Sequence, residues 1–231
     1  MSNSAPLGGR TLVGFDLETT GVDPYEARIV TASLCTIGEA DRNWLADPGI
    51  EIPAGSTAVH GITTDHARTQ GRAAREVVEE VACSLSDTWQ NGDVVVIYNA
   101  AYDLRVVTEE LVRHGLPPIT IGPVLDPLVI WRNAERYRKG KKTLAEAVLR
   151  FGVELTAPHE SAADATAAIL VTEGLAQLVP WRIWTPEEAA QLQQNWNREW
   201  ADNFAAFLKG KGGDWESVDG SWPLGARRAA T

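Results

Sequence analysis

The feature that most constrains the fold is a short apolar segment near the start of the chain that ends in two acidic residues. Residues 11–15 read Thr-Leu-Val-Gly-Phe and are followed by Asp16 and Glu18. The segment is typical of a buried strand, in which residues two positions apart share a face and lie about 6.6 Å apart. Two carboxylates on one face of a buried strand repel each other and are costly to desolvate. A hard divalent cation would stabilise them; the alternative is a solvated strand end.

The apolar patterns predict an α/β fold, because segments with strand periodicity alternate with segments of helical periodicity. The segments that fit strands are 11–15, 28–35, 43–46, 94–98 and 123–126. Those that fit helices are 76–89, 100–113, 142–151 and 161–178. The first three strands have short connections and should run antiparallel to their neighbours. We therefore expect one central mixed five-stranded sheet flanked by helices.

Composition narrows the class of protein. The chain has 231 residues, 44% of them hydrophobic, which is enough for one packed domain with an appendage. Its net charge of -10 argues against a protein that coats nucleic acid unspecifically, because such affinity is built from Lys and Arg. With no long apolar segment and no secretory signal pattern, we expect a cytoplasmic protein that does not contact a membrane. Cys35 and Cys83 fit neither a disulfide framework nor a metal site and are expected to be buried thiols.

A third acidic residue, Asp103, follows the β-branched segment 94–98 at the start of a predicted helix. If that segment lies beside the first strand, the strand-to-helix corner would direct Asp103 toward Asp16 and Glu18. The alternative is a purely local role, because an acid in the first turn of a helix is stabilised by the helix dipole.

A histidine and a fourth acid occur in the segment 158–164, Pro-His-Glu-Ser-Ala-Ala-Asp. Residues five apart in one helix differ by about 140° around its axis, so His159 and Asp164 could not face one site from the same helix. Pro158 and Ser161 indicate that the helix begins between them. The alternative is that Ser161 and Asp164 form a capping box and that His159 is an ordinary loop residue.

These residues form the ordered series Asp16, Glu18, Asp103, His159 and Asp164. The series resembles the DEDDh 3′-to-5′ exonucleases, the family of the proofreading epsilon subunit of bacterial DNA polymerase III. The matching segments are 15–21 (Phe-Asp-Leu-Glu-Thr-Thr-Gly), 99–103 (Asn-Ala-Ala-Tyr-Asp) and 159–164, with further likeness at 59–63 and 142–144. The resemblance runs from about residue 10 to residue 177, and it implies a ribonuclease H-like fold.

The resemblance implies that four acids hold two divalent cations, Mg²⁺ or Mn²⁺, and that His159 is the general base. The four acids are Asp16, Glu18, Asp103 and Asp164. Two ions can stabilise the attacking and the leaving oxygen of a phosphodiester displacement, and a histidine can accept a proton near neutral pH. The family pattern also implies substrate-binding residues beside the terminal nucleotide: Thr19, Thr20, His60, Ile62 and Asn99. Turn chemistry, loop packing and helix capping are the alternatives for these five.

The predicted function is metal-dependent 3′–5′ hydrolysis of single-stranded DNA to nucleoside 5′-monophosphates, in proofreading or DNA repair. A 3′–5′ exoribonuclease of the same family is the alternative, because no residue identifies itself as a partner of the 2′-hydroxyl. Two other classes are an inactive nucleic-acid-binding scaffold and a phosphatase with Asp16 as nucleophile. Retention of all five residues argues against the scaffold. The haloacid dehalogenase type of phosphatase has an aspartate where this chain has Glu18.

The end of the chain differs in character, so we divide the chain into a catalytic domain (1–178) and a Trp-rich helical extension with a tail (179–231). Six of the nine tryptophans follow Pro180. After a helix start at 185–188, apolar residues recur at four-residue intervals in an amphipathic stripe: Leu192, Trp196, Trp200, Phe204 and Leu208. This stripe would either dock onto the catalytic domain or bind a DNA polymerase, a sliding clamp or a second copy. The resemblance leaves the oligomeric state open.

Overall fold

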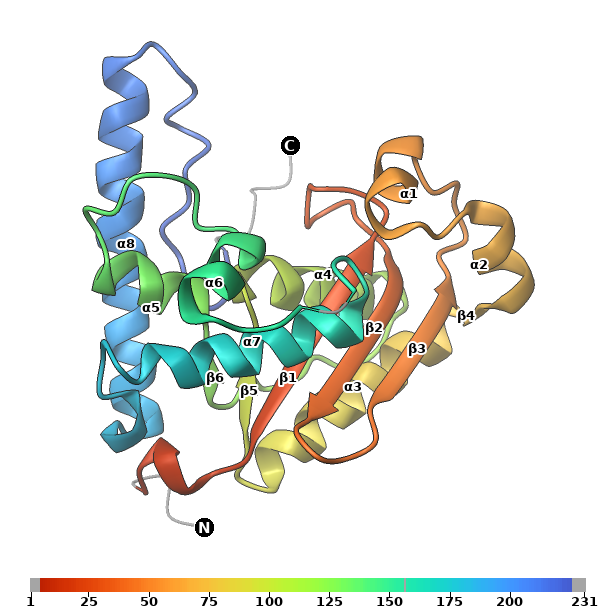
Figure 1. The fold of residues 1–231 in the computed structure, drawn as a ribbon. Coiled ribbons are helices and arrows are strands. Elements are labelled where there is room, and N and C mark those ends of the chain that lie inside the picture. Colours follow the sequence, from red (N-terminus) through yellow and green to blue (C-terminus); the bar gives the residue numbers. More distant parts are fainter. Residues whose placement is uncertain (1–4, 156, 226–231) are drawn as a thin grey trace.

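The computed structural model, which describes residues 5–155 and 157–225, has a central mixed sheet with helices on both faces (Figure 1). The strand order is β4-β3-β2-β1-β5-β6. The strands are β1 (Leu12–Thr19), β2 (Ile29–Thr36), β3 (Arg42–Asp47), β4 (Arg72–Ala73), β5 (Val94–Val96) and β6 (Val124–Leu125). β1, β2 and β3 form the predicted antiparallel meander, whereas β5 runs parallel to β1 and to β6.

The predicted α/β architecture is confirmed, with six strands in place of the expected five. The additional strand, β4, pairs with β3 through two residues only. Two residues are too few to produce an alternating pattern, so sequence periodicity could not reveal this strand.

The helices are α1 (Ala54–His60), α2 (Thr64–Gln70), α3 (Ala74–Gln90), α4 (Ala100–Arg113), α5 (Pro127–Ala134), α6 (Leu144–Phe151), α7 (Ser161–Leu175) and α8 (Pro186–Gly210). Helical predictions are confirmed for α3, α4, α6 and α7, and for the helix after residue 185. The short helices α1, α2 and α5 were not predicted. α1 buries none of its residues, so it carries no amphipathic signal, and it begins after Pro53 without a side-chain cap.

Alternation along β1 separates the two faces of the sheet. Val13, Phe15 and Leu17 belong to the hydrophobic core that also contains the buried residues of α3 and α4. Gly14, Asp16 and Glu18 therefore lie on the opposite face. That face is covered by α7, which contacts both β1 and β2 (Figure 1).

α8 closes the edge of the sheet beside β6 and α5. Gln193 is fully buried there: its amide nitrogen donates to the Val124 carbonyl at 3.0 Å, and its Oε1 accepts from the Asp126 backbone N–H at 2.7 Å. An open strand edge would leave such backbone groups unpaired, and α8 satisfies them. Trp222 also returns to the core and donates from its indole to Asp126 at 3.3 Å.

The face of α8 that is fully buried is not the predicted apolar stripe. It consists of the next row of residues, Ala189, Gln193, Asn197 and Ala201. The predicted stripe docks in part: Leu192 and Trp196 pack against the hydrophobic core, whereas Trp200 is half-buried and Phe204 is 38% exposed. Small residues on the inner row allow α8 to approach β6 and α5 closely, which places the larger aromatic rings beside the contact.

Two further sequence expectations concern burial and membranes. Cys35 is buried as expected, but Cys83 is exposed on α3, so the prediction of a buried thiol is wrong for Cys83. At about 100° per residue, position 83 lies on the opposite side of α3 from its row of buried residues, which includes Val81 and Leu85. Among the described helices, none combines the length and hydrophobicity of a membrane span.

Candidate active site

Close packing of α7 on β1 brings the two acids of the first strand next to the start of α7. A Cβ added to Gly14 would lie 2.3 Å from the backbone oxygen of Ala165. Only glycine permits this approach of backbone to backbone. Asp16 and Glu18 share the face of Gly14, and Asp164 precedes the contacting residue of α7 by one position. The acids of the first and last motifs are therefore held close together by the packing of the two elements.

Asp103 reaches the same place from α4. The parallel strands β1 and β5 end at the same edge of the sheet, and α4 begins four residues after β5. Asn99 makes this corner with a left-handed backbone (φ 71°) and Asp126 accepts hydrogen bonds from the backbone N–H groups of Asn99 and Ala100 at 3.1 and 2.9 Å. Asp103 is 4% exposed and accepts a hydrogen bond from the backbone of Leu17, which lies between the two acids of β1.

His159 occupies an exposed turn directly before α7. Its backbone is left-handed (φ 67°), which is uncommon for a residue with a side chain, and its N–H donates to Asp164 Oδ2 at 3.2 Å. Ser161 begins α7, but its hydroxyl contacts Ser33 Oγ at 2.7 Å and caps no backbone group. The capping-box alternative for Ser161 and Asp164 is therefore wrong. The helix does begin between His159 and Asp164, as their spacing predicts.

The structure gathers the predicted acids and the histidine at one place. Ligand atoms of Glu18, His159 and Asp164 all lie within 4.8 Å of one another. Asp16 experiences the charges of Asp103, Asp164 and Glu18, which places its carboxyl among the other three. Asp164 Oδ1 is buried and has no hydrogen-bond partner. An orphaned carboxylate oxygen amid other acids fits a hard divalent cation, which is bound through oxygen ligands.

Burial and mutual repulsion keep these carboxyl groups protonated to unusually high pH. Burial, followed by the charge of Asp164, raises the pKa of Glu18 to about 8. The pKa of Asp16 is raised well above its ordinary value by burial first and then by its three acidic neighbours. The pKa values of Asp103 and Asp164 are also raised, in both cases mainly by burial. The site therefore favours either protons or cations over bare carboxylates.

These shifts predict how stability depends on pH. The pKa of Glu18 lies above its ordinary value of 4.5, so between pH 4.5 and pH 8 the folded chain binds more protons than the unfolded chain. In EDTA, the free energy of unfolding should fall as pH rises through this window, and Mg²⁺ should oppose the fall because it binds the deprotonated acids. Urea unfolding at several pH values, with EDTA or Mg²⁺, measures both effects. Stability in EDTA that rises with pH would contradict the arrangement of acids.

The close contact at Gly14 can be tested by adding one methyl group. Gly14→Ala should push α7 away from β1 and lower the free energy of unfolding by about 1–3 kcal/mol. It should also weaken Mn²⁺ binding, because Asp164 moves with α7. The matched control is Gly55→Ala, where an added Cβ meets nothing within 4 Å. Urea unfolding and Mn²⁺ titration of both variants check this. Equal stability and equal Mn²⁺ affinity of the two variants would show that Gly14 does not set the distance between α7 and β1.

The five predicted substrate-binding residues differ in whether their side chains are already engaged by contacts within the protein. The hydroxyl of Thr20 accepts from the Arg28 backbone at 2.9 Å, and that of Thr19 contacts Tyr102 and the Gly21 carbonyl at 2.6 and 2.9 Å. Both hydroxyls thus serve the protein's own structure. Ile62 packs between α1 and α2 against a small buried cluster. Asn99 forms the corner before α4 without capping the helix through its side chain.

His60 is the exception among these residues. Its Nδ1 accepts from the Ile62 backbone at 3.1 Å, so the proton of the neutral ring is on Nε2. Nε2 is buried beside the Thr19 backbone, yet it has no partner with hydrogen-bond geometry. Burial, and then the charge of His159, lowers the pKa of His60, which keeps the ring neutral. The Nε2–H of His60 therefore lies against the Thr19 backbone, next to the acidic cluster, without a hydrogen bond of good geometry.

Asp126 and Tyr102 are the site residues that sequence reasoning missed or misjudged. Asp126 is 1% exposed and links three segments: the corner before α4, the start of α5 and Trp222. The sequence Leu125-Asp126-Pro127 contains the signal, since an acid before proline is typical of a helix start. Tyr102, for which the sequence predicted no such contact, is half-buried, and its hydroxyl contacts Thr19 and donates to the Gly21 carbonyl.

The chain is similar to known proteins over about 70% of its length. A family model described as exonuclease matches residues 13–172. The PolC-type DNA polymerase III of Streptococcus pneumoniae is 35% identical over 167 residues, covering 70% of this chain and 11% of that protein; the enzyme of Streptococcus sanguinis is 34% identical over 167 residues, with the same shares. The chain thus spans about a tenth of the length of these curated relatives.

Solved structures share the fold. An exonuclease I structure has a TM-score of 0.64 at 19% identity and covers 74% of this chain and 42% of the other. E. coli exonuclease I in complex with a dA16 oligonucleotide has a TM-score of 0.60 at 19% identity, with shares of 74% and 41%. A zinc-bound form of the E. coli enzyme with single-stranded DNA has a TM-score of 0.61 at 20% identity, with the same shares.

Proposed function

This chain belongs to the exonuclease family, of the DEDD type, and we propose from this premise that it removes nucleotides from the 3′ end of single-stranded DNA with two divalent cations, Mg²⁺ or Mn²⁺. The observation that carries the proposal is the convergence of four acids and one histidine from three separated segments, with one carboxylate oxygen left unpaired. The oligonucleotide complexes of exonuclease I, which has the same fold, favour single-stranded DNA as substrate.

Each residue of the cluster has a role in this proposal. The carboxylates that would hold the cations are Asp16, Glu18, Asp103 and Asp164. The ions would neutralise these acids and stabilise the charge that develops on the phosphodiester during its displacement. His159 would accept the proton of the attacking water, since its imidazole lies beside Glu18 and Asp164 on a turn that substrate can reach. Water attacks phosphorus directly, so no covalent enzyme intermediate forms and the product is a nucleoside 5′-monophosphate.

The chain is proposed to act near DNA synthesis or repair, in the cytoplasm. The PolC-type relatives are DNA polymerases by name, which favours a DNA polymerase or a sliding clamp as partner. In this proposal residues 1–178 are the catalytic unit and 179–231 are an extension that completes its sheet edge. A 3′–5′ exoribonuclease is the second candidate, because no residue of the chain identifies itself as a partner of the 2′-hydroxyl that distinguishes RNA from DNA.

The test of this function is digestion of matched DNA and RNA strands labelled at either end, with Mg²⁺, Mn²⁺ or EDTA. We expect a 5′-labelled DNA strand to shorten progressively and a 3′-labelled strand to release labelled mononucleotide at once, both only with metal. Shortening from the 5′ end, or undigested DNA with Mn²⁺, would refute the proposal. Faster digestion of RNA than of DNA would select the second candidate.

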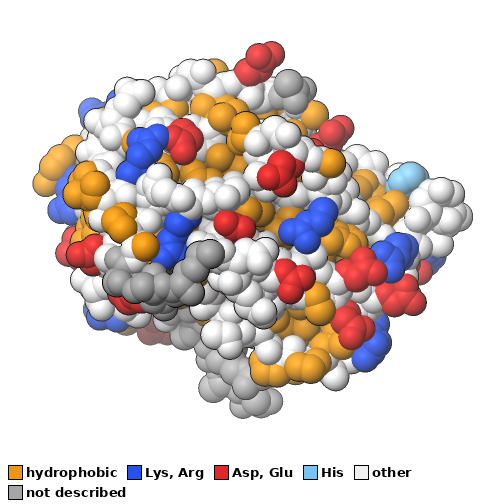
Figure 2. Space-filling model, turned by 90° about the horizontal axis from the view of Figure 1, so that it is seen from below, with side chains coloured by type: hydrophobic (Ala, Val, Ile, Leu, Met, Phe, Trp, Pro, Cys, Tyr) orange, Lys and Arg blue, Asp and Glu red, His pale blue; other side chains and the backbone are white. Residues whose placement is uncertain are grey.

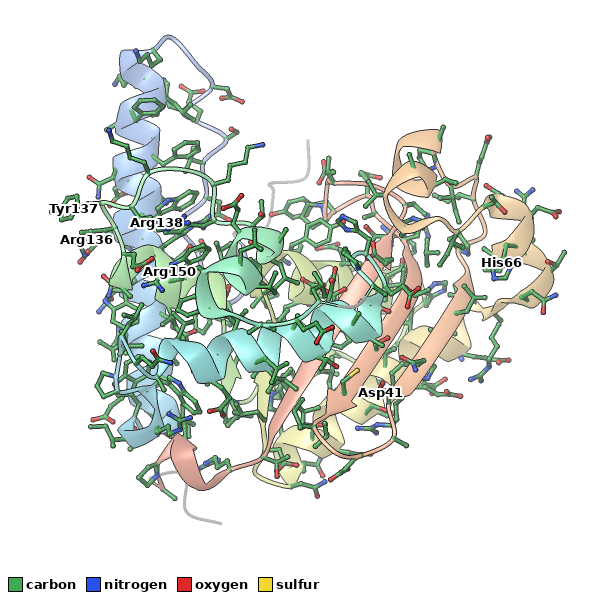
Figure 3. All side chains as sticks on the ribbon, viewed as in Figure 1. Asp41, His66, Arg136, Tyr137, Arg138 and Arg150 are labelled. Atoms are coloured by element: carbon green, nitrogen blue, oxygen red, sulfur yellow. The ribbon has the colours of Figure 1, made fainter. Side chains whose placement is uncertain are left out.

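His60 is expected to bind the terminal nucleotide through its Nε2–H, which lies beside the Thr19 backbone. His60→Ala should raise KM about fivefold, the value of one hydrogen bond, and change kcat by less than about twofold. His66→Ala is the control, because His66 is exposed on α2, on the side of the molecule away from α8 (Figure 3). Steady-state kinetics on a short oligonucleotide compares the two. If KM is unchanged in His60→Ala, His60 does not bind the nucleotide and only packs within its loop.

A further inference from the structure

A cavity of about 730 Å³ lies between α8 and the segment that joins α5 to α6. We call it the α5–α8 cavity. Four cationic residues line it, Arg132, Arg136, Lys141 and Lys142, against a single acid, Glu199. The chain as a whole carries a net charge of -10. On the face shown in Figure 2, cationic and anionic side chains are interspersed. The α5–α8 cavity differs from that face, because cations outnumber acids among its lining residues.

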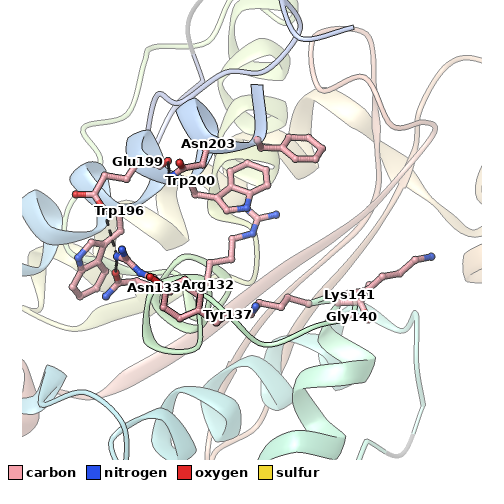
Figure 4. A pocket seen from close by; sticks show the side chains of 13 residues that line it. Arg132, Asn133, Tyr137, Gly140, Lys141, Trp196, Glu199, Trp200 and Asn203 are labelled. Atoms are coloured by element: carbon pink, nitrogen blue, oxygen red, sulfur yellow. Dashed lines mark hydrogen bonds and ion pairs between the residues drawn. The ribbon is translucent and has the colours of Figure 1, made fainter. Parts of the chain in front are cut away.

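Arg132 is the central residue of the α5–α8 cavity. Its guanidinium stacks on the Trp200 ring, 3.6 Å from the ring centroid, as Figure 4 shows. It is half-buried and within reach of the charge of Asp126, but within the part of the chain that the structure describes no hydrogen bond or ion pair engages its N–H groups. The five N–H donors of an arginine in such a position match the oxygens of a phosphate. The structure thus leaves hydrogen-bond donors on a positive charge for an anionic ligand.

Aromatic rings accompany these charges. Trp200 and Phe204 are stacked with their centroids 5.1 Å apart, and Phe204 is 38% exposed. Tyr137 is 90% exposed at the cavity, next to Arg136 on the same segment (Figures 3 and 4). A cationic groove with accessible aromatic rings is the arrangement that binds single-stranded nucleic acid, because phosphates meet the cations and bases stack on the rings.

A second cavity borders both the α5–α8 cavity and the start of α4, the helix that carries Asp103. This second cavity, of about 650 Å³, shares Arg132 and Trp200 with the α5–α8 cavity and is also lined by Asn99 and Tyr102. Tyr102 neighbours Asp103 in sequence and contacts Thr19. The second cavity includes the acids Glu216 and Asp219 besides Arg105, so its charge is mixed. A strand that leaves the acidic cluster could cross this second cavity and reach the cations beyond it.

We infer that the α5–α8 cavity binds the single strand on the 5′ side of the nucleotide being removed, with a phosphate at Arg132. The inference rests on the proposed function and adds a second binding region. Its cations lie within the matched residues 13–172, whereas α8 contributes Trp200 and Phe204 from beyond them. Binding there would favour long strands over short ones and would hold a strand between successive cleavages.

The test compares short and long substrates in three variants. Arg132→Gln removes the central charge, Lys142→Gln removes a second cation of the cavity, and Lys139→Gln is the control, an exposed lysine of the same segment that does not line the cavity. The short substrate is the p-nitrophenyl ester of thymidine 5′-monophosphate, which cannot reach beyond the active site. The long substrate is single-stranded DNA, assayed at several salt concentrations, and circular dichroism confirms that each variant is folded.

For long DNA we expect KM to rise roughly tenfold in Arg132→Gln and also to rise in Lys142→Gln, because each loses a charged contact. The dependence of log KM on log salt should weaken by about 0.7 for each lost phosphate contact. The ester should be hydrolysed equally by all four proteins, and Lys139→Gln should match the unchanged chain.

Two results would overturn the inference while the exonuclease function stands. One is that both cavity variants keep the unchanged chain's ratio of kcat/KM on long DNA to kcat/KM on the ester. The other is that an acidic, Phe-containing peptide binds the unchanged chain, and that Arg132→Gln loses this peptide binding but keeps its DNA binding. The cavity would then bind a protein partner. Absence of hydrolysis of any DNA by the unchanged chain is a different outcome and would refute the proposed function itself.

Discussion

Replacing Asp16 by Asn should abolish catalysis and at the same time stabilise the metal-free chain. The carboxyl of Asp16 interacts electrostatically with all three of its acidic neighbours, so Asp16 is expected to contact both cations. Loss of metal-ion catalysis removes several kcal/mol of transition-state stabilisation, which lowers turnover by at least about 10³-fold. Removing its charge also relieves repulsion within the cluster, so the unfolding temperature in EDTA at pH 8 should rise.

Metal dependence separates this explanation from simple damage to the fold. Mn²⁺ should raise the unfolding temperature of the unchanged chain but not that of Asp16→Asn, because only the unchanged chain binds the ions tightly. Asp87→Asn is the control, since it makes the same chemical change on the exposed face of α3. Thermal unfolding with and without Mn²⁺, followed by activity measurements, covers both effects. A variant that is inactive but still stabilised by Mn²⁺ would show that Asp16 does not hold the metal.

His159→Asn should lose about 10²–10⁴-fold in kcat while it keeps its affinity for Mn²⁺. Asn is chosen because it tolerates the left-handed backbone of this turn, so the variant should fold normally. The backbone N–H that binds Asp164 remains in place, and only the proton acceptor is removed. Single-turnover digestion of labelled DNA gives the rate, and Mn²⁺ titration gives the affinity.

The affinity for Mn²⁺ separates the two roles that the position of His159 permits, proton acceptor and metal ligand. If His159→Asn loses Mn²⁺ affinity and activity to the same degree, His159 is a metal ligand, which its distance from Glu18 and Asp164 also permits.

Much of the site could be predicted because it depends on short-range geometry. Alternation in a strand was enough to place Asp16 and Glu18 on one face, and the angle per helical residue was enough to place a helix start between His159 and Asp164. That Asp103 lies near the other acids depends on the pairing of β5 with β1, which the family resemblance implied and the structure confirms.

The parts that were not predicted depend on packing between distant segments. Gln193 reads as an ordinary polar residue on an amphipathic helix, and only the edge of β6 explains its complete burial. The sequence left open whether the apolar stripe of α8 docks onto the domain or binds a partner, and it did not indicate that the closest approach is made by the neighbouring row with the small residues Ala189 and Ala201. Arg132 likewise has no signal in the sequence, because its stacking partner Trp200 is far along the chain and comes from another helix.

The central claim is that the four acids hold divalent cations for hydrolysis, and diffraction at the manganese absorption edge tests it most directly. Crystals of the full chain would be soaked with Mn²⁺ and the product thymidine 5′-monophosphate. We predict two anomalous peaks about 3.5–4 Å apart, both in contact with Asp16 and enclosed by the other three acids: Glu18, Asp103 and Asp164. Saturating Mn²⁺ that gives peaks elsewhere and none in this cluster would contradict the account.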